Sequence, residues 1–303
     1  MTSRPRYFQI ADISIEVNSD LPIRSDTFDP KFETFRIEQP GKDLVRIFHH
    51  FEHPEIDFQS LGDPAYQKAP WAIYPRDNGW LYLGTLPDNF KESFWKVALF
   101  NHDHSVGHIY HLTTDGLAAE GLHALTGFPT DQIWLARLLA DRRGCYIHSA
   151  GAIINGKGFL FVGHSEAGKS TTTQMLLDAK YRGNQKPLDI EILCDDRNIV
   201  RYDSHGWEVY GSWSHGDVPI VSANASPLNA ICFLEQAPKN ELILLTDHQK
   251  IFRRLMACVI KPFVDGDWWH KTINVIVQLA NEVPCYAMRF DKSGRILREI
   301  LRI

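Results

Sequence analysis

The segment with the clearest chemical meaning is residues 163–170, Gly-His-Ser-Glu-Ala-Gly-Lys-Ser, which matches the pattern GxxxxGK[ST] in full. An apolar strand-like run at 158–162 precedes it, and a run with helical composition at 171–180 follows it. In a strand–loop–helix arrangement, glycines permit a tight loop whose backbone N–H groups face phosphate oxygens, and the helix start adds a positive dipole. We therefore predict that a nucleotide is bound by Gly163, His164, Ser165, Glu166, Ala167, Gly168, Lys169, Ser170 and Thr171.

Two side chains of this segment have predicted roles in the chemistry. Lys169 would bring a positive charge to the β- and γ-phosphates of the nucleotide. The hydroxyl of Ser170 stands where such loops coordinate Mg²⁺. The expected ligands are therefore ATP and Mg²⁺.

A pair of carboxylates, Asp195 and Asp196, follows the apolar strand-like run at 190–194. Ligands of open sheets collect beyond the carboxyl ends of strands, where the glycine-containing segment also lies. One carboxylate of the pair can hold Mg²⁺ and the other can accept a proton from an attacking hydroxyl. His148, in the strand before the glycine-containing segment, would reach the phosphates if its strand neighbours that segment.

The ordered combination of 147–151, 163–171 and 194–196 resembles the catalytic domain of HPr kinase/phosphorylase, and more distantly ATP-dependent phosphoenolpyruvate carboxykinase. The resemblance continues through 226–236 and 283–290, so that it covers residues 131–303. It implies transfer of the γ-phosphoryl group of ATP to a hydroxyl, usually that of a serine. By the same likeness His148 is an active-site residue, and one of Asp195 and Asp196 is the base while the other helps to hold the metal. Of the two assignments we favour Asp195 as the base, so that the expected catalytic residues are His148, Lys169 and Asp195 and the expected metal ligands are Ser170 and Asp196.

The acceptor of the phosphoryl group is left open between a protein, a peptide and a small molecule. Residues 208–213 lack the acidic, Arg-Gly signature of the bifunctional enzymes, so we expect no reverse phosphorylase reaction, and the N-terminal half does not favour HPr as acceptor. The polar loop 213–217, with Trp213 and His215, is predicted to contact the acceptor. The alternative function is that of a non-catalytic nucleotide-binding regulatory or assembly protein.

The elements that must position these residues predict an α/β fold class. We expect a catalytic domain of HPr-kinase type at 126–303 and a β-rich N-terminal domain of unknown role at 1–125. Strand-like runs in the first half lie at 8–17, 31–37, 71–74, 79–84 and 106–112. The histidines at 102, 104, 108 and 111 are interpreted as a polar strand surface and not as a metal site.

The composition of the chain indicates which partners and which cellular compartment to expect. The 303 residues carry a formal net charge of −5, which argues against non-specific nucleic-acid binding. The five cysteines form no CxxC pair, which fits a reducing compartment. With no apolar run long enough to span a bilayer, we expect a cytoplasmic protein without a membrane partner. The oligomeric state stays open, a homo-oligomer included.

Overall fold

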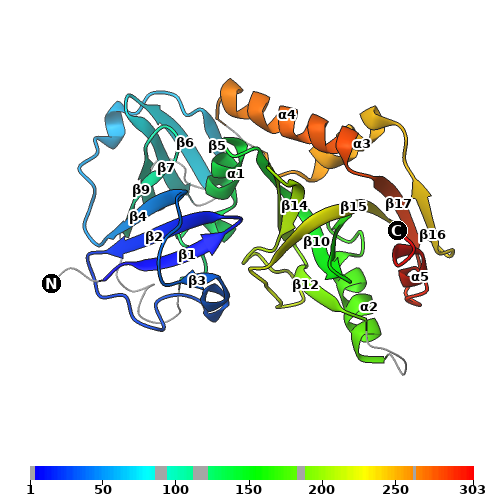
Figure 1. Ribbon diagram of the computed structural model, residues 1–303. Coiled ribbons are helices and arrows are strands. Elements are labelled where there is room, and N and C mark those ends of the chain that lie inside the picture. Colours follow the sequence, from blue (N-terminus) through cyan, green and yellow to red (C-terminus); the bar gives the residue numbers. More distant parts are fainter. Residues whose placement is uncertain (1–3, 86–93, 112–121, 183–187, 262–263) are drawn as a thin grey trace. The chain divides into compact units, whose positions relative to one another are not determined.

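The structure is a computed structural model that describes residues 4–85, 94–111, 122–182, 188–261 and 264–303 (Figure 1). The chain divides into two compact units. The first unit comprises residues 1–141 and 262–269, and the second comprises 142–261 and 270–303. The division therefore falls after the predicted boundary at 125, and a short later segment returns to the first unit.

The first unit is built on one mixed sheet of nine strands, in the order β3-β1-β2-β4-β9-β8-β7-β6-β5. β2, β4 and β9 are parallel neighbours, whereas the other pairs are antiparallel. The strands are β1 (Arg6–Ile10), β2 (Ile13–Ser19), β3 (Arg36–Ile37), β4 (Leu44–His50), β5 (Tyr66–Lys68), β6 (Trp71–Arg76), β7 (Gly79–Thr85), β8 (Phe94–Phe100) and β9 (Val106–His111). The helices are η1 (Pro30–Phe35), η2 (Phe58–Ser60), η3 (Pro129–Asp131) and α1 (Gln132–Ala140).

Two sequence predictions in the first unit were wrong in detail. The expected strand at 8–17 is a hairpin, because Ala11 and Asp12 have positive φ angles of 46° and 61° and reverse the chain. The expected strand at 31–37 is mostly the 3₁₀ helix η1, in which Asp29 caps the backbone N–H of Lys31. Residue 112 of the predicted strand 106–112 lies outside the described residues.

The second unit contains an eight-stranded mixed sheet. Its strands are β10 (Gly144–Ile154), β11 (Lys157–Val162), β12 (Ile190–Cys194), β13 (Arg197–Asp203), β14 (Gly206–Tyr210), β15 (Ala225–Gln236), β16 (Glu241–Leu244) and β17 (Cys285–Phe290). Its helices are α2 (Lys169–Arg182), α3 (His248–Cys258), α4 (Gly266–Glu282) and α5 (Leu297–Ile300), and the first residues of α4 belong to the first unit.

Strand pairing in the second unit closes on itself through two long strands. The first half of β10 pairs with β13 and its second half with β11 and β12. The first three residues of β15 pair with β14, and the remainder runs parallel to β11 and β17. The pairings β11–β10–β13–β14–β15–β11 therefore form a ring, which positions the ends of several strands around one edge.

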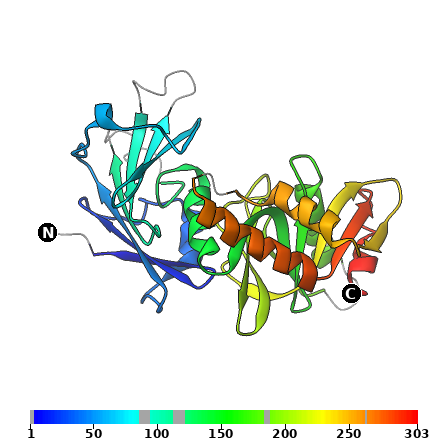
Figure 2. The same ribbon diagram turned by 90° about the horizontal axis from the view of Figure 1, so that it is seen from above.

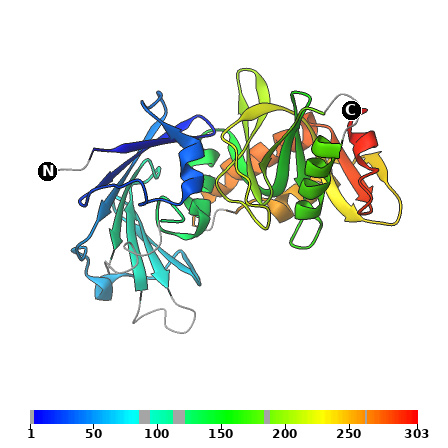
Figure 3. The same ribbon diagram turned by 90° about the horizontal axis from the view of Figure 1, so that it is seen from below.

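Side chains alternate across the sheet of the second unit, so that both of its faces are apolar. In β11, Leu160 and Val162 pack in one core with residues of α3 and α4, whereas Phe159 and Phe161 pack in a second core with residues of α2 and α5. Figure 2 shows α3 and α4 over one face, and Figure 3 shows α2 over the other. Within the described residues, no helix is both long and apolar enough to cross a bilayer.

The predicted α/β class is wrong for this chain. Strands make up 40% of the structure and helices 23%, and both large sheets are mixed. The glycine-containing segment and its flanking runs suggested a strand–helix–strand unit as the core of the domain, but the chain also forms the antiparallel β13–β14 hairpin at Arg197–Tyr210. That hairpin and the nine-stranded sheet of the first unit make the protein mainly β.

Candidate functional site

The predicted site residues gather at one edge of the sheet in the second unit. β11, β15 and β17 are parallel, and β12 points the same way because it is antiparallel to β10. The glycine-containing segment follows β11, and the two aspartates follow β12. A cleft of about 460 Å³ opens there, lined by His148, Ser165, Glu166, Gly168, Lys169, Ser170, Thr171, Asp195, Asp196, Gly216, Asp217, Gln236 and Lys292. This volume is within the usual range for small-ligand sites.

Residues 163–168, called the glycine loop below, need glycine at both ends. A Cβ atom on Gly163 would lie 2.5 Å from the Cβ of Ala167. Gly168 has a φ of 106°, and a Cβ there would lie 2.7 Å from the Phe290 ring. Between them, Glu166 also has a positive φ, and its carbonyl accepts a hydrogen bond of 2.7 Å from Gln236 Nε2. The loop is therefore held in a tight conformation that other residues would disturb.

Lys169, the first residue of α2, folds back over the glycine loop. Its Nζ donates to the carbonyl oxygens of Gly163, at 3.2 Å, and of His164, at 3.1 Å. Burial lowers the pKa of Lys169, although nearby Asp196 acts in the opposite direction. The amine thus lies at the helix start, where the backbone N–H groups and the helix dipole favour anions.

Asp195 is buried and turned toward the start of α2. Only 1% of its surface is exposed, and its carboxylate accepts hydrogen bonds from the backbone N–H of Gly216, at 2.6 Å, and of Val218, at 2.9 Å. Ser170 Oγ lies 3.2 Å from Asp195 Oδ2 and 3.3 Å from Asp217 Oδ2. One hydroxyl and two carboxylates therefore meet at a single point.

Asp196 is turned toward a different set of residues. Its Oδ1 lies 2.8 Å from His148 Nε2, and its Oδ2 accepts a hydrogen bond from Arg197. Burial would raise the pKa of Asp196, but His148, Arg197 and Lys169 together lower it below its usual value. Asp196 is thus held as a carboxylate, paired with a histidine that also lines the cleft.

A metal ion such as Mg²⁺ fits the oxygen cluster. Ser170, Asp195 and Asp217 present the hard oxygen ligands that Mg²⁺ prefers, and Mg²⁺ keeps several waters in addition. Across the described ranges, no group of three or more His, Cys, Asp and Glu residues is arranged to hold a metal. The donor set of one hydroxyl and two carboxylates consists of oxygen atoms, which suit Mg²⁺.

The loop predicted to contact the acceptor lies at the site, but the residues that line the cleft are not the two that we expected. The side chain of Trp213 is fully buried, and His215 is half-buried with its Nδ1 3.1 Å from the Gly216 carbonyl. Gly216 and Asp217 of the same loop line the cleft.

Sequence reasoning overlooked Arg197, Asp217, Gln236 and Lys292. Gln236 is the last residue of β15 and Lys292 follows β17, so position at the carboxyl end of a strand is the signal that would have found these two. Arg197 is the first residue of β13, and Asp217 belongs to the loop just described.

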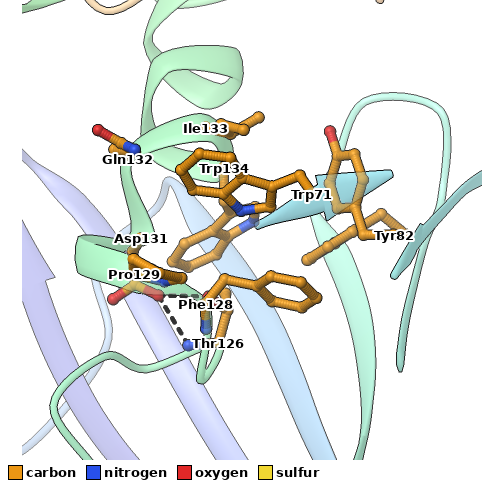
Figure 4. Close-up of a pocket in the computed structure, with 10 residues that line it drawn as sticks. Trp71, Tyr82, Thr126, Phe128, Pro129, Asp131, Gln132, Ile133 and Trp134 are labelled. Atoms are coloured by element: carbon orange, nitrogen blue, oxygen red, sulfur yellow. Dashed lines mark hydrogen bonds between the residues drawn. The ribbon is translucent and has the colours of Figure 1, made fainter. Parts of the chain in front are cut away.

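A second hollow, within the first unit, is too small for a ligand. Figure 4 shows it between the side chains of Trp71, Tyr82, Phe128 and Trp134. Its volume is about 10 Å³, which is room for a single water molecule. The adjacent carboxylate of Asp131 accepts hydrogen bonds from Leu125 and Thr126, so it stabilises its own turn.

Of the four histidines predicted to form a polar strand surface, His102 is exposed and His108 is half-buried, but the other two are buried. His104 and His111 are buried, and His111 Nε2 lies 2.8 Å from Nδ1 of the buried His49 on the neighbouring strand. Lys96 Nζ lies 2.8 Å from His111 Nδ1. Cross-strand pairing buries these groups in the sheet.

Comparison with known families assigns the second half of the chain. Residues 132–303 match the family described as SynChlorMet cassette protein ScmC. No curated protein matches the sequence. Because the family match spans more than half of the chain, this protein belongs to the family of SynChlorMet cassette proteins ScmC.

Proposed function

We propose that this protein is an ATP-dependent phosphotransferase, which moves the γ-phosphoryl group of ATP to a hydroxyl group of an acceptor. The observation that carries the proposal is the meeting, in one cleft, of the glycine loop with Lys169 and Ser170 and of the carboxylates Asp195 and Asp196. This combination supplies the parts that phosphoryl transfer requires, which are charge neutralisation, positioning and a proton acceptor.

The glycine loop and the start of α2 would bind the phosphates of ATP. Lys169 Nζ now binds two carbonyl oxygens of the loop, at 3.1 and 3.2 Å. When ATP is bound, phosphate oxygens would replace these neutral acceptors, because hydrogen bonds between charged groups are roughly twice as strong. Lys169 would then neutralise charge that develops on the transferred group.

The oxygen cluster of Ser170, Asp195 and Asp217 would hold Mg²⁺. Bound there, Mg²⁺ would neutralise charge on the β- and γ-phosphates. Asp195 suits this role better than the base role expected from the resemblance, because two backbone N–H groups and Ser170 already face its carboxylate.

The His148–Asp196 pair would accept the proton of the attacking hydroxyl. Asp196 fixes the orientation of the His148 ring through the 2.8 Å hydrogen bond, and Arg197 holds the carboxylate in turn. A histidine oriented by a carboxylate can act as a general base. This reverses the roles expected for the two aspartates.

A paired measurement tests the proposal. The full chain is titrated with ATP and Mg²⁺ by calorimetry, and is then incubated with labelled ATP and serine-containing proteins, peptides and free hydroxy amino acids. We expect micromolar to millimolar ATP binding that depends on Mg²⁺, and label on at least one acceptor. ATP binding without any transfer in a broad screen would favour the non-catalytic regulator instead, and absence of ATP binding would exclude both.

A further inference from the structure

A separate hollow of about 330 Å³ lies beside the glycine loop in the second unit, between the loop and α3. Gly163 and His164 of the loop form one wall, and the helix forms the other. The helix contributes three basic side chains, Lys250, Arg253 and Arg254. This hollow has no part in the reaction as described above.

The basic residues form a stripe along one side of α3. They are spaced i, i+3 and i+4, which brings them to the same side of a helix. The opposite side, with Ile251 and Leu255, is buried in the core. Among the residues that the structure describes, neither Lys250 nor Arg253 forms an ion pair, and both are exposed. In a protein with a net charge of −5, this stripe is a local excess of positive charge.

Arg254 is positioned to bind a further anion. Its guanidinium lies over the Phe233 ring, 5.0 Å from the centroid, and Nη2 pairs with Glu235. Nη1 is buried and has no hydrogen-bond partner within the described part of the chain. A buried N–H group without a partner is costly, so a ligand that accepts its hydrogen bond would gain affinity. Glu235 does not neutralise the positive charge of the stripe, because Glu235 also accepts a hydrogen bond of 3.2 Å from Arg289.

The glycine loop connects this hollow with the cleft. Gly163 and His164 line the hollow, and their carbonyls accept the hydrogen bonds of Lys169, which lines the cleft. A ligand in the hollow would thus contact the same loop that borders the proposed phosphate site. The hollow is therefore our candidate for the residues that flank the acceptor hydroxyl.

We propose that this hollow binds an acidic peptide segment of the phosphoryl acceptor, an inference that rests on the proposed function. Lys250 and Arg254 are four residues apart, or about 6 Å along the helix axis. Side chains two residues apart on an extended peptide have nearly the same spacing, about 6.6 Å. The stripe therefore matches successive carboxylates of a peptide better than it matches a single small anion.

The test uses the full chain and a fluorescein-labelled peptide, Glu-Asp-Glu-Ser-Glu-Asp, with binding followed by fluorescence anisotropy at low salt. We expect the double variant Lys250→Glu, Arg253→Glu to weaken peptide binding about tenfold or more, since attraction becomes repulsion. The matched control is Lys180→Glu with Arg298→Glu, which makes the same charge change at exposed positions of α2 and α5. The control should bind the peptide as the wild type does.

ATP affinity, measured by calorimetry on the same proteins, separates this inference from the function on which it rests. We expect the α3 variant to bind ATP as the wild type does. Loss of ATP affinity with unchanged peptide binding would assign the stripe to the nucleotide and overturn the inference. Equal binding of a Gln-Asn-Gln-Ser-Gln-Asn peptide, or displacement of the acidic peptide by submillimolar inorganic phosphate, would overturn it as well. A wild type that binds no ATP would instead refute the proposed function.

Discussion

His148 Nε2 and Asp196 Oδ1 lie 2.8 Å apart although 48 residues separate them in the chain. The contact exists because β10 pairs with β13, which sets His148 opposite Arg197, the residue after Asp196. Asp195, one residue earlier, is turned to Ser170 instead. Two neighbouring carboxylates thereby acquire different surroundings, and on this ground we propose different functions for them.

Replacing Lys169 by alanine should weaken ATP binding. The substitution removes the one cationic side chain at the start of α2, and a charged hydrogen bond of this kind contributes about 1.5–3 kcal/mol. We expect a loss of about 10- to 100-fold in affinity by calorimetry. The control is Lys180→Ala, an exposed lysine on the same helix, which should change nothing. Equal ATP affinity in both variants would refute the phosphate-binding role of the loop.

The variants Ser170→Ala and Asp196→Asn should fail in different ways. Ser170→Ala removes an oxygen from the predicted Mg²⁺ cluster, so Mg²⁺-dependent ATP affinity should fall while residual transfer persists at saturating Mg²⁺. Asp196→Asn removes the carboxylate that orients His148, so transfer should fall about 10²- to 10⁴-fold while ATP affinity stays within about threefold. The comparison needs calorimetry and a transfer assay on the same samples. If Asp196→Asn lost ATP affinity and Asp195→Asn kept it, the original assignment of Asp195 as base would be restored.

Gly168→Ala should disrupt the glycine loop by close contact as well as by backbone strain. Gly168 and Gly156 both have positive φ angles, but only at Gly168 would a Cβ meet a neighbour, the Phe290 ring at 2.7 Å. We expect Gly156→Ala to lower the free energy of unfolding by about 1 kcal/mol and Gly168→Ala to lower it by about 2–4 kcal/mol. Gly168→Ala should also abolish ATP binding. Urea unfolding and calorimetry give both quantities. Similar costs with ATP binding retained in both variants would contradict a tightly packed loop.

Acid should destabilise the first unit through its buried histidines. Burial lowers the pKa of His49 and of His104 to about 3, and that of His111 to about 2. Unfolded histidines titrate near 6.5, so below about pH 6.5 the unfolded chain binds more protons than the folded one and stability falls with pH. As the pH falls below 6.5, each of these histidines should lower the free energy of unfolding by up to about 1.4 kcal/mol per pH unit, until the pH reaches the pKa of that histidine in the folded protein.

Urea unfolding between pH 7.5 and 5, followed by circular dichroism, measures this dependence. His104→Gln can keep the hydrogen bond that joins His104 to the Tyr82 hydroxyl, but it cannot titrate. The free energy of unfolding of this variant should therefore fall less steeply with decreasing pH than that of the wild type, and the difference should equal the contribution of one histidine. His53→Gln changes an exposed histidine and should follow the wild type. A steep, unchanged pH dependence in His104→Gln would contradict the prediction.

Local pattern was enough to predict the elements that flank the glycine loop and the aspartate pair. The strands expected at 158–162 and 190–194 correspond to β11 and β12, and the run of helical composition at 171–180 lies within α2. These predictions rest on patterns among neighbouring residues, namely apolar runs and the spacing of glycines. Such patterns can be recognised without knowledge of tertiary contacts. In the first unit the same reasoning mistook η1 for a strand. Phe32 and Phe35 are both buried and three residues apart, a helical spacing that the alternation of 31–37 obscured.

Only the tertiary structure decided the separate partners of the two aspartates, the remaining residues of the site and the fold class. The sequence places Asp195 and Asp196 side by side, but their separate partners depend on the pairing of β10 with β12 and β13. Asp217, Gln236 and Lys292 join the cleft because their segments follow or end strands that meet at one edge. The mainly β class likewise depends on which strands pair across long stretches of chain. Strand pairing is a long-range choice, set by burial over whole faces, and a local pattern cannot determine it.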